Sequence, residues 1–332
     1  MKKLLEIKDL KVNFTTYAGN VQAVRGVSFD VNAGEAIAIV GESGCGKSVT
    51  AQTIMKLIPS PPGEIVGGSI HFAGQDLVAK NEKAMEKIRG KEIGMIFQDP
   101  MTSLNPTMTV GRQIMEVLQK HQNIKKEQQQ AKALEMLNLV GIPNPEKRMT
   151  QYPHEFSGGM RQRAMIGIAL ACNPKLLIAD EPTTALDVTI QAQIMELMTD
   201  LKTKFGTSII LITHDLGVVA GFAERIVVMY AGRVIETGNT QDVFYQPRHP
   251  YTKGLLASIP RPVGHEKVKL TPIPGRPPDL INPPQGCAFW PRCQQAMKIC
   301  RQGQSETVEV SPGHLVSCWL TQVPKSVKLG VN

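Results

Sequence analysis

The chain alternates short apolar runs with longer segments in which apolar residues recur at helical spacing. The short runs have the length of buried strands, at 35–40, 69–72, 93–98, 176–180 and 208–213. Helical spacing predicts helices over 50–58, 114–120 and 190–202. Strands that alternate with helices predict a mostly parallel sheet with helices on its faces.

Two segments depart from this pattern. Residues 227–238 contain two β-rich runs on either side of Ala231 and Gly232, which predicts a hairpin. The composition changes from about residue 259, and eight prolines crowd into residues 260–284. That stretch cannot be regular helix or central strand, and it predicts an extended connector. We therefore expect one large domain over 1–258 and a small Pro-rich, Cys-rich extension over 259–332.

The composition indicates a folded, basic chain. Of 332 residues, 42% are hydrophobic and 20% are charged, which is typical of a globular protein. The net charge of +8 suits a basic soluble protein, and it leaves an anionic ligand, nucleic acid or a membrane surface as partners. No apolar run could span a bilayer and no signal peptide is evident, so we expect a cytosolic chain with reduced cysteines.

The most specific motif is GESGCGKS, from Gly41 to Ser48, which lies between a predicted strand and a predicted helix. In such a P-loop, backbone N–H groups surround the phosphates of a nucleotide. Lys47 is expected to reach the β- and γ-phosphates, and the Ser48 hydroxyl to bind Mg²⁺. The expected nucleotide contacts are Gly41, Ser43, Gly44, Cys45, Gly46, Lys47, Ser48 and Val49.

Two further motifs extend this chemistry. LLIADEP, at 176–182, ends a strand with Asp180, a candidate Mg²⁺ ligand, and Glu181, a candidate general base for an attacking water. FSGGM, at 156–160, offers Ser157 as an N-cap before Gly158 and Gly159. That start predicts a second anion-binding helix N-terminus, far from the P-loop in sequence.

Together these motifs resemble those of the ATP-binding cassette (ABC) ATPases, whose signature is usually LSGGQ. The resemblance covers roughly residues 4 to 255. It implies an α/β fold: a RecA-like core with a parallel sheet, an N-terminal antiparallel β region, and a helical subdomain at about 99–172. Phe156 and Met160 depart from the usual signature, but Phe156 keeps an apolar anchor and Met160 keeps its backbone N–H.

The resemblance also implies roles for residues outside the three motifs. Gln98 matches the Q-loop that senses Mg²⁺ and couples to a membrane partner, and His214 matches the switch histidine. Asp187 belongs to the D-loop segment TTALD at 183–187. Phe14 matches the aromatic residue that stacks on adenine, with Tyr17 as a nearby alternative.

In this family two cassettes pair head to tail, and each ATP lies between one P-loop and the partner's signature helix. Ser157, Gly158 and Gly159 would therefore contact the partner's nucleotide. This arrangement accounts for a second anion-binding helix start far from the P-loop.

Several segments narrow the branch of the family. Ser157 follows Ser48 by 109 positions without a long heptad segment, which disfavours the chromosome-maintenance and DNA-repair branch. The segments at 96–106, 180–194, 229–238 and 248–256 resemble the ATPase subunits of bacterial dipeptide and oligopeptide permeases, and the likeness continues into GCAFWPRC at 286–293.

This resemblance implies an ATP- and Mg²⁺-dependent ATPase that energises peptide import at the cytoplasmic face of the membrane. Its partners would be a second cassette, usually a paralogue, two transmembrane permease subunits and an extracellular peptide-binding protein, with no nucleic acid. Three alternatives are a nickel importer, a non-transport ABC ATPase that acts on nucleic acid, and a P-loop kinase, which would not need FSGGM.

Four of the six cysteines lie in the extension, at Cys287, Cys293, Cys300 and Cys318. Their spacing, C-x₅-C-x₆-C-x₁₇-C, fits structural zinc poorly and does not match ferredoxins. Some of the resembled peptide-permease ATPases carry a [4Fe–4S] cluster in this tail. The resemblance therefore implies a structural cluster on these four thiolates, with zinc or free thiols as alternatives.

Overall fold

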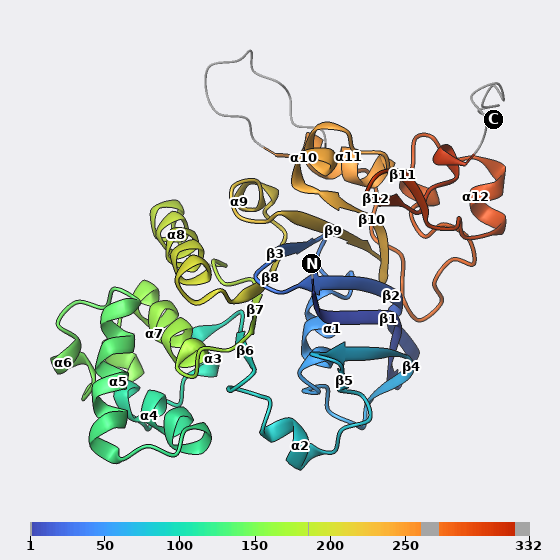
Figure 1. Ribbon diagram of the computed structural model, residues 1–332. Coiled ribbons are helices and arrows are strands. Elements are labelled where there is room, and N and C mark those ends of the chain that lie inside the picture. The colour runs from blue at the N-terminus through green and yellow to red at the C-terminus, as the bar shows by residue number, and fades with distance from the viewer. Residues whose placement is uncertain (1, 185, 260–271, 323–332) are drawn as a thin grey trace, which may run out of the picture. The chain divides into compact units, whose positions relative to one another are not determined.

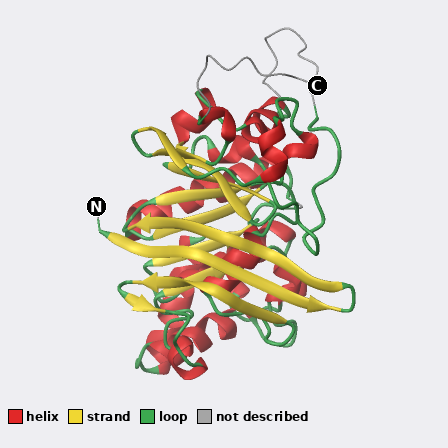
Figure 2. Cartoon of the chain, turned by 90° about the vertical axis from the view of Figure 1, so that its right-hand side faces the viewer, coloured by secondary structure: helices red, strands yellow, loops and turns green. Residues whose placement is uncertain are grey.

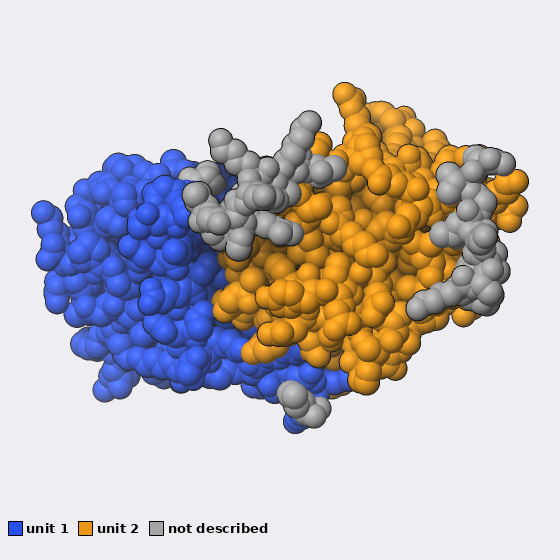
Figure 3. Space-filling model, turned by 90° about the horizontal axis from the view of Figure 1, so that it is seen from above, with its two compact units in different colours: residues 1–3, 31–36, 79–212 blue, residues 4–30, 37–78, 213–332 orange. Residues whose placement is uncertain are grey.

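The computed structural model describes residues 2–184, 186–259 and 272–322. They form two compact units: unit 1 holds residues 1–3, 31–36 and 79–212, and unit 2 holds 4–30, 37–78 and 213–332 (Figure 3). A helix or strand that crosses a unit boundary belongs to the unit that holds most of its residues. The D-loop residue Ala185, and residues 260–271 and 323–332 of the expected extension, lie outside the described residues.

Unit 2 contains an antiparallel sheet with the strand order β2-β1-β4-β5, whose long strands are prominent in Figure 2. Its strands are β1 (Lys3–Thr16), β2 (Gly19–Asn32), β4 (Gly63–Phe72) and β5 (Gln75–Asp76). Along β1, Leu5 and Ile7 are buried, and then Leu10 and Val12. The switch from odd to even positions coincides with a register shift between Lys8 and Lys11, so the bulge keeps apolar side chains on the core face.

A second set of strands in unit 2 has the order β11-β12-β10-β9-β3. Its strands are β3 (Ala36–Val40), β9 (Arg225–Tyr230), β10 (Arg233–Asn239), β11 (Val308–Ser311) and β12 (His314–Val316). The predicted hairpin is confirmed: β9 and β10 flank Ala231 and Gly232, both of which have positive φ, as a two-residue I′ turn requires. In this strand set β12 pairs with β10, and β11 with β12, so the extension adds two strands that the sequence did not predict.

Along the chain, the helices of unit 2 connect or follow these strands (Figure 1). They are α1 (Lys47–Ile54), α9 (Leu216–Val219), α10 (Thr240–Tyr245), α11 (Pro250–Ala257) and α12 (Lys298–Gln302), with 3₁₀ turns η2 (Trp290–Arg292) and η3 (Trp319–Thr321). Helix α1 begins three residues earlier than the helix predicted at 50–58, directly after the P-loop glycines. It ends before Lys56, whose φ of 50° is left-handed.

Unit 1 carries the parallel strands β8-β7-β6 in that order. These are β6 (Ile93–Ile96), β7 (Leu176–Asp180) and β8 (Ser208–Thr213), at the positions that the apolar runs predicted. Its helical elements are α2 (Glu82–Glu86), α3 (Pro100–Ser103), α4 (Val110–His121), α5 (Lys126–Leu139), α6 (Pro145–Arg148), η1 (Pro153–Glu155), α7 (Gly158–Leu170) and α8 (Val188–Phe205). Helices α4, α5 and α7 contact one another. Among the described residues, no helix has the length and apolar character needed to cross a membrane.

A buried polar network joins the extension to the rest of unit 2. Glu236 of β10 is fully buried, and its carboxylate accepts hydrogen bonds from the backbone N–H of Arg248 (2.7 Å) and His249 (3.0 Å). The same carboxylate lies 2.8 Å from Nε2 of His314 on β12. Burial lowers the pKa of His249 to about 3, so its neutral ring accepts the Tyr251 N–H through Nδ1. The network therefore satisfies polar groups from β10, α11 and the extension together.

We predict that Glu236→Ala lowers the free energy of unfolding by about 3 to 5 kcal/mol, because it leaves buried polar partners without an acceptor. Denaturant unfolding of the purified chain measures this. Glu306→Ala is the matched control: Glu306 is exposed in the same extension, so its replacement should cost within about 0.5 kcal/mol. Equal losses of unfolding free energy in the two variants would contradict the stabilising role assigned to Glu236.

Candidate functional site

The P-loop of unit 2 follows strand β3 and has the backbone that its motif predicts. Gly41 and Gly46 have φ values of 155° and 98°. A Cβ at Gly41 would lie 2.3 Å from the carbonyl oxygen of Met229, and one at Gly46 would lie 2.4 Å from that of Ala23. Glycine is therefore required at both positions by conformation and by the approach of neighbouring backbone.

Lys47 is the first residue of α1 and is buried at 4% exposure. Its Nζ donates to the carbonyl oxygens of Gly41 (2.7 Å) and Glu42 (3.1 Å). These bonds hold the ammonium over the loop, where the motif expects it to meet phosphate oxygens. Ser43 and Gly44 are exposed, whereas Cys45 is buried and burial raises the pKa of its thiol.

Unit 2 also carries two residues named by the family resemblance. His214 is exposed directly after β8, and the neighbouring Asp215 caps α9 by accepting from the Gly217 N–H. Phe14 is half-buried on β1 opposite Gly63. Tyr17, the nearby alternative, is fully exposed in the turn after β1.

Unit 1 brings the Q-loop glutamine and the acidic pair together. Asp180 ends β7 and is 4% exposed, and Glu181 follows it with a left-handed φ of 48°. Nε2 of Gln98 donates to Oε2 of Glu181 at 3.0 Å, and the Thr184 hydroxyl donates to the same oxygen at 2.9 Å. Two donors therefore orient the candidate general base, although 83 positions separate Gln98 from Glu181.

The signature segment has the predicted helix start. Ser157 is the N-cap of α7, and its Oγ accepts the Met160 N–H at 3.3 Å. Phe156 is buried at 2% exposure, whereas Ser157 and Gly158 are exposed. The apolar anchor thus faces the core of unit 1, and the N–H groups of the helix start remain at the surface.

The arginines near the start of α7 form hydrogen bonds to other segments of unit 1. Nε of Arg161 donates to the carbonyl of Pro153 at 2.9 Å. Arg163 donates to the carbonyl of Val140 (2.7 Å) and to Gln193 (3.1 Å). Anion binding at this helix would therefore depend on backbone N–H groups.

The D-loop residue Asp187 caps helix α8, since its Oδ1 accepts the Ile190 N–H at 3.0 Å. A Cβ built on Gly159 would lie 3.1 Å from Cγ2 of Ile190. A glycine at the fourth signature position therefore lets α7 approach the start of α8.

The four cysteines of the extension lie in one region of unit 2. The Cys287 N–H donates to the carbonyl of Cys300 at 2.9 Å. Burial, and then the neighbouring thiols, raise the pKa of Cys287 to about 11 and that of Cys318 to about 12. Within the described ranges, no group of three or more His, Cys, Asp or Glu side chains is arranged to hold a metal ion.

The fold and these motifs define a P-loop nucleotide-binding cassette, and comparison with known proteins specifies the family. Residues 24–184 match the family described as ABC transporter, and 235–300 match the oligopeptide/dipeptide transporter C-terminal region.

Curated relatives match nearly the whole chain. The oligopeptide transport ATP-binding protein OppD of Bacillus subtilis (strain 168) is 64% identical over 96% of this chain and 89% of its own length. The dipeptide transport ATP-binding protein DppD of the same organism is 57% identical over 96% and 95%.

Among solved structures, the ATP-binding cassette MJ0796, in a dimeric post-hydrolysis state with ADP and Pi, has a TM-score of 0.64 at 28% identity. The match covers 71% of this chain and 98% of that one. The chain belongs to the ATP-binding subunits of ABC transporters, in the oligopeptide and dipeptide branch. The resemblance inferred from the motifs is thereby confirmed, and the P-loop kinase is excluded.

Two features of the site were not anticipated from the sequence. Thr184 lies in the TTALD segment, but the segment does not indicate that its hydroxyl forms a hydrogen bond with Glu181. Glu42 lies inside the P-loop motif, yet its partner Arg292 is 250 positions away. The only sequence signal for Arg292 was its place in GCAFWPRC, which marked the branch of the family.

We predict that Gly158→Asp leaves nucleotide binding by the isolated chain intact and abolishes ATP hydrolysis by the paired cassettes. A Cβ at Gly158 meets nothing within 4 Å, and a carboxylate suits a helix N-terminus, so the chain should fold normally. The added negative charge would compete with the partner's γ-phosphate for the helix start. Thermal unfolding measures whether the variant folds, nucleotide titration measures binding by the isolated chain, and phosphate release measures hydrolysis by the paired cassettes.

Gly221→Asp is the matched control, because a Cβ at this exposed glycine also meets nothing within 4 Å and it lies outside the ATP motifs. Loss of nucleotide binding by isolated Gly158→Asp chains would contradict binding in trans.

Proposed function

We propose that this chain is the ATP-hydrolysing subunit that energises an importer of di- and oligopeptides. The observation that carries the proposal is the match of residues 235–300 to the oligopeptide/dipeptide transporter C-terminal region, in a chain whose cassette motifs are complete. This region lies beyond the P-loop and LLIADEP, so it adds information about the transporter branch that the ATP motifs do not contain.

The chemistry we propose rests on the geometry of each unit. In unit 2 the loop from Gly41 to Ser48 binds the phosphates through its N–H groups, and Lys47 supplies the ammonium. In unit 1 Glu181 accepts a proton from the attacking water. Gln98 and Thr184 hold its carboxylate through two hydrogen bonds, which keeps one rotamer of the base in place.

The ligands that we propose for Mg²⁺ are Ser48, Gln98 and Asp180. They offer a hydroxyl, an amide oxygen and a buried carboxylate, which are the oxygen donors that Mg²⁺ prefers. When bound, the ion would neutralise charge that develops on the phosphates. His214 is proposed to contact the γ-phosphate and Phe14 the adenine. Asp187 is proposed as a further nucleotide-binding residue.

The proposed assembly follows from the relatives, which are transport ATP-binding proteins. We propose a second cassette, a paralogue of this chain, two membrane permeases and an extracellular peptide-binding protein, with this chain at the cytoplasmic membrane face. We also propose the boundary at residue 258 between cassette and extension, with a helical subdomain at about 99–172.

We predict that Glu181→Gln lowers the ATP hydrolysis rate of the assembled complex by roughly 10²- to 10⁴-fold, as loss of a general base does. Glutamine keeps the size and hydrogen bonds of Glu181, so ATP should still bind and hold the cassettes paired. Lys47→Ala is the contrasting variant, since it should weaken nucleotide binding itself. Phosphate release and nucleotide titration separate the two, and near-normal hydrolysis by the Glu181→Gln complex would refute the assignment of the base.

We further propose that the extension binds a [4Fe–4S] cluster through Cys287, Cys293, Cys300 and Cys318, with zinc as the alternative metal. Cys287, Cys293 and Cys300 lie close enough to Cys318 to raise the pKa of its thiol, so the four sulfur donors lie in one small region. Four thiolates are a donor set that such a cluster or zinc can use. The side chains as described do not form a ready-made metal group. Binding would therefore require the thiol side chains to rearrange, and the bound group would hold the extension together.

Protein purified without oxygen is predicted to be brown and to contain iron and sulfide in about equal amounts. Cys293→Ser should remove the colour, whereas Cys172→Ser should not, because Cys172 lies in unit 1. Metal analysis and the visible spectrum measure this. Colourless anaerobic protein that contains zinc, or no metal, would exclude the cluster and leave the ATPase assignment unchanged.

A further inference from the structure

The P-loop contains a negative charge of its own. Glu42 is the second residue of GESGCGKS, and its side chain is 27% exposed. A carboxylate within a loop that binds a triphosphate repels that ligand, and the repulsion is strongest where water is excluded. A site of this kind needs a nearby cation, other than the lysine that binds phosphate, to cancel the charge.

Arg292 supplies that cation from the C-terminal extension. Its side chain is 5% exposed. Its guanidinium donates two hydrogen bonds to the Glu42 carboxylate, Nη1 to Oε2 at 2.6 Å and Nη2 to Oε1 at 2.9 Å. Paired bonds of this geometry are the strong form of an arginine–carboxylate contact. All of these residues belong to unit 2.

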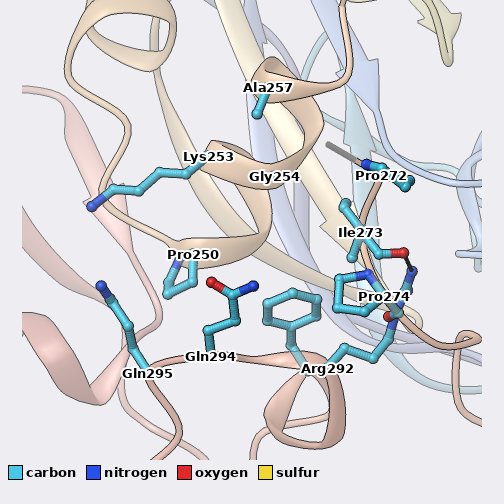
Figure 4. A pocket seen from close by; sticks show the side chains of 11 residues that line it. Pro250, Lys253, Gly254, Ala257, Pro272, Ile273, Pro274, Arg292, Gln294 and Gln295 are labelled. Atoms are coloured by element: carbon cyan, nitrogen blue, oxygen red, sulfur yellow. Dashed lines mark hydrogen bonds between the residues drawn. The ribbon is translucent and has the colours of Figure 1, made fainter. Parts of the chain in front are cut away.

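The remaining donors of Arg292 fix its orientation. Nε donates to the carbonyl of Pro274 (2.8 Å), Nη1 to the Tyr230 hydroxyl (3.2 Å), and Nη2 to the carbonyl of Ile273 (3.5 Å). Figure 4 shows the side chain extending toward Ile273 and Pro274, beside a cavity of about 250 Å³. Every N–H of the guanidinium thus has a protein partner, so the group serves the P-loop and not a ligand in the cavity.

The backbone of Glu42 is held from a second direction. Its N–H donates to the hydroxyl of Tyr251 at 2.8 Å, and Tyr251 is fully buried on α11. The rings of Tyr230 and Phe289 pack against Tyr251 at centroid distances of 4.6 and 5.4 Å. Phe289 belongs to the extension, so the aromatic cluster that positions Tyr251 is completed by the same segment that carries Arg292.

We propose that Arg292 is a positioning residue of the nucleotide site: it neutralises Glu42 and, together with Tyr251, fixes the P-loop for tight ATP binding. The C-terminal extension is then part of the ATP site and not an independent appendage. This proposal rests on the proposed function of the P-loop in ATP binding.

The test is a double-mutant cycle on the affinity of the full chain for ATP, measured by equilibrium titration. Arg292→Met keeps the bulk of the stem and removes the charge, so the dissociation constant should rise roughly ten-fold. In a Glu42→Gln background the same substitution should raise it less than about three-fold, because no carboxylate is left to repel the phosphates. The Glu42→Gln variant alone separates the two roles. Cancellation of a repulsive charge predicts that it binds ATP about as tightly as the wild type, whereas a residue that only anchors the extension through this ion pair predicts weaker binding.

Arg301→Met is the matched control. Arg301 lies in the same extension and stacks on Trp290 at 4.5 Å, and it is exposed. Its replacement should leave ATP affinity unchanged. Should Arg292→Met not fold, two milder variants carry the test: Arg292→Lys loses the two-bond fork but keeps the charge, and Tyr251→Phe loses the acceptor for the Glu42 N–H. Each should weaken ATP binding by about two- to five-fold.

Unchanged affinity in these variants, or equal losses in both backgrounds of the cycle, would overturn the proposal. A wild-type chain that does not bind ATP would instead refute the proposed function itself.

Discussion

The backbone of the P-loop constrains much of unit 2. The glycines at 41 and 46 bring the loop so close to neighbouring carbonyls that no side chain fits between them. Each close approach fixes one neighbour: Ala23 on β2 and Met229 on β9. The β9–β10 turn adds a hydrogen bond, from the Gly232 N–H to the Cys45 carbonyl at 3.0 Å. Contacts from β2, β9 and the β9–β10 turn thus hold the loop in place.

The extension continues the same construction. Its two strands extend the β9–β10 edge, and Glu236 binds His314 and the backbone before α11 in one buried network. Phe289 enters the apolar cluster that contains Val40 and Tyr251. Through these contacts the residues after the proline-rich segment share a core with the strand that leads into the P-loop. This common core makes an effect of the extension on ATP binding physically reasonable.

Unit 1 orients the carboxylate of Glu181, which we propose as the general base. Glu181 takes a left-handed backbone conformation, which is costly for a residue with a side chain. Its N–H donates to the carbonyl of Ile212 at 2.9 Å, and its carboxylate is held by Gln98 and Thr184. Strain of this kind persists only where surrounding bonds determine the geometry, and it is common at catalytic positions.

The sequence alone determined the local features of this protein. It determined the positions of β3, β6, β7 and β8, the hairpin at Ala231 and Gly232, the N-cap at Ser157 and the P-loop glycines. All of these depend on residues that are adjacent or nearly so, and their physical requirements appear in the pattern itself. The family could be recognised for the same reason, because its motifs are short and continuous. Only the tertiary structure decided that Arg292 meets Glu42, that Gln98 meets Glu181, and that the last strands join β10. These partners are brought together by chain folding over 78 to 250 positions, and one sequence does not indicate which of its many residues will meet.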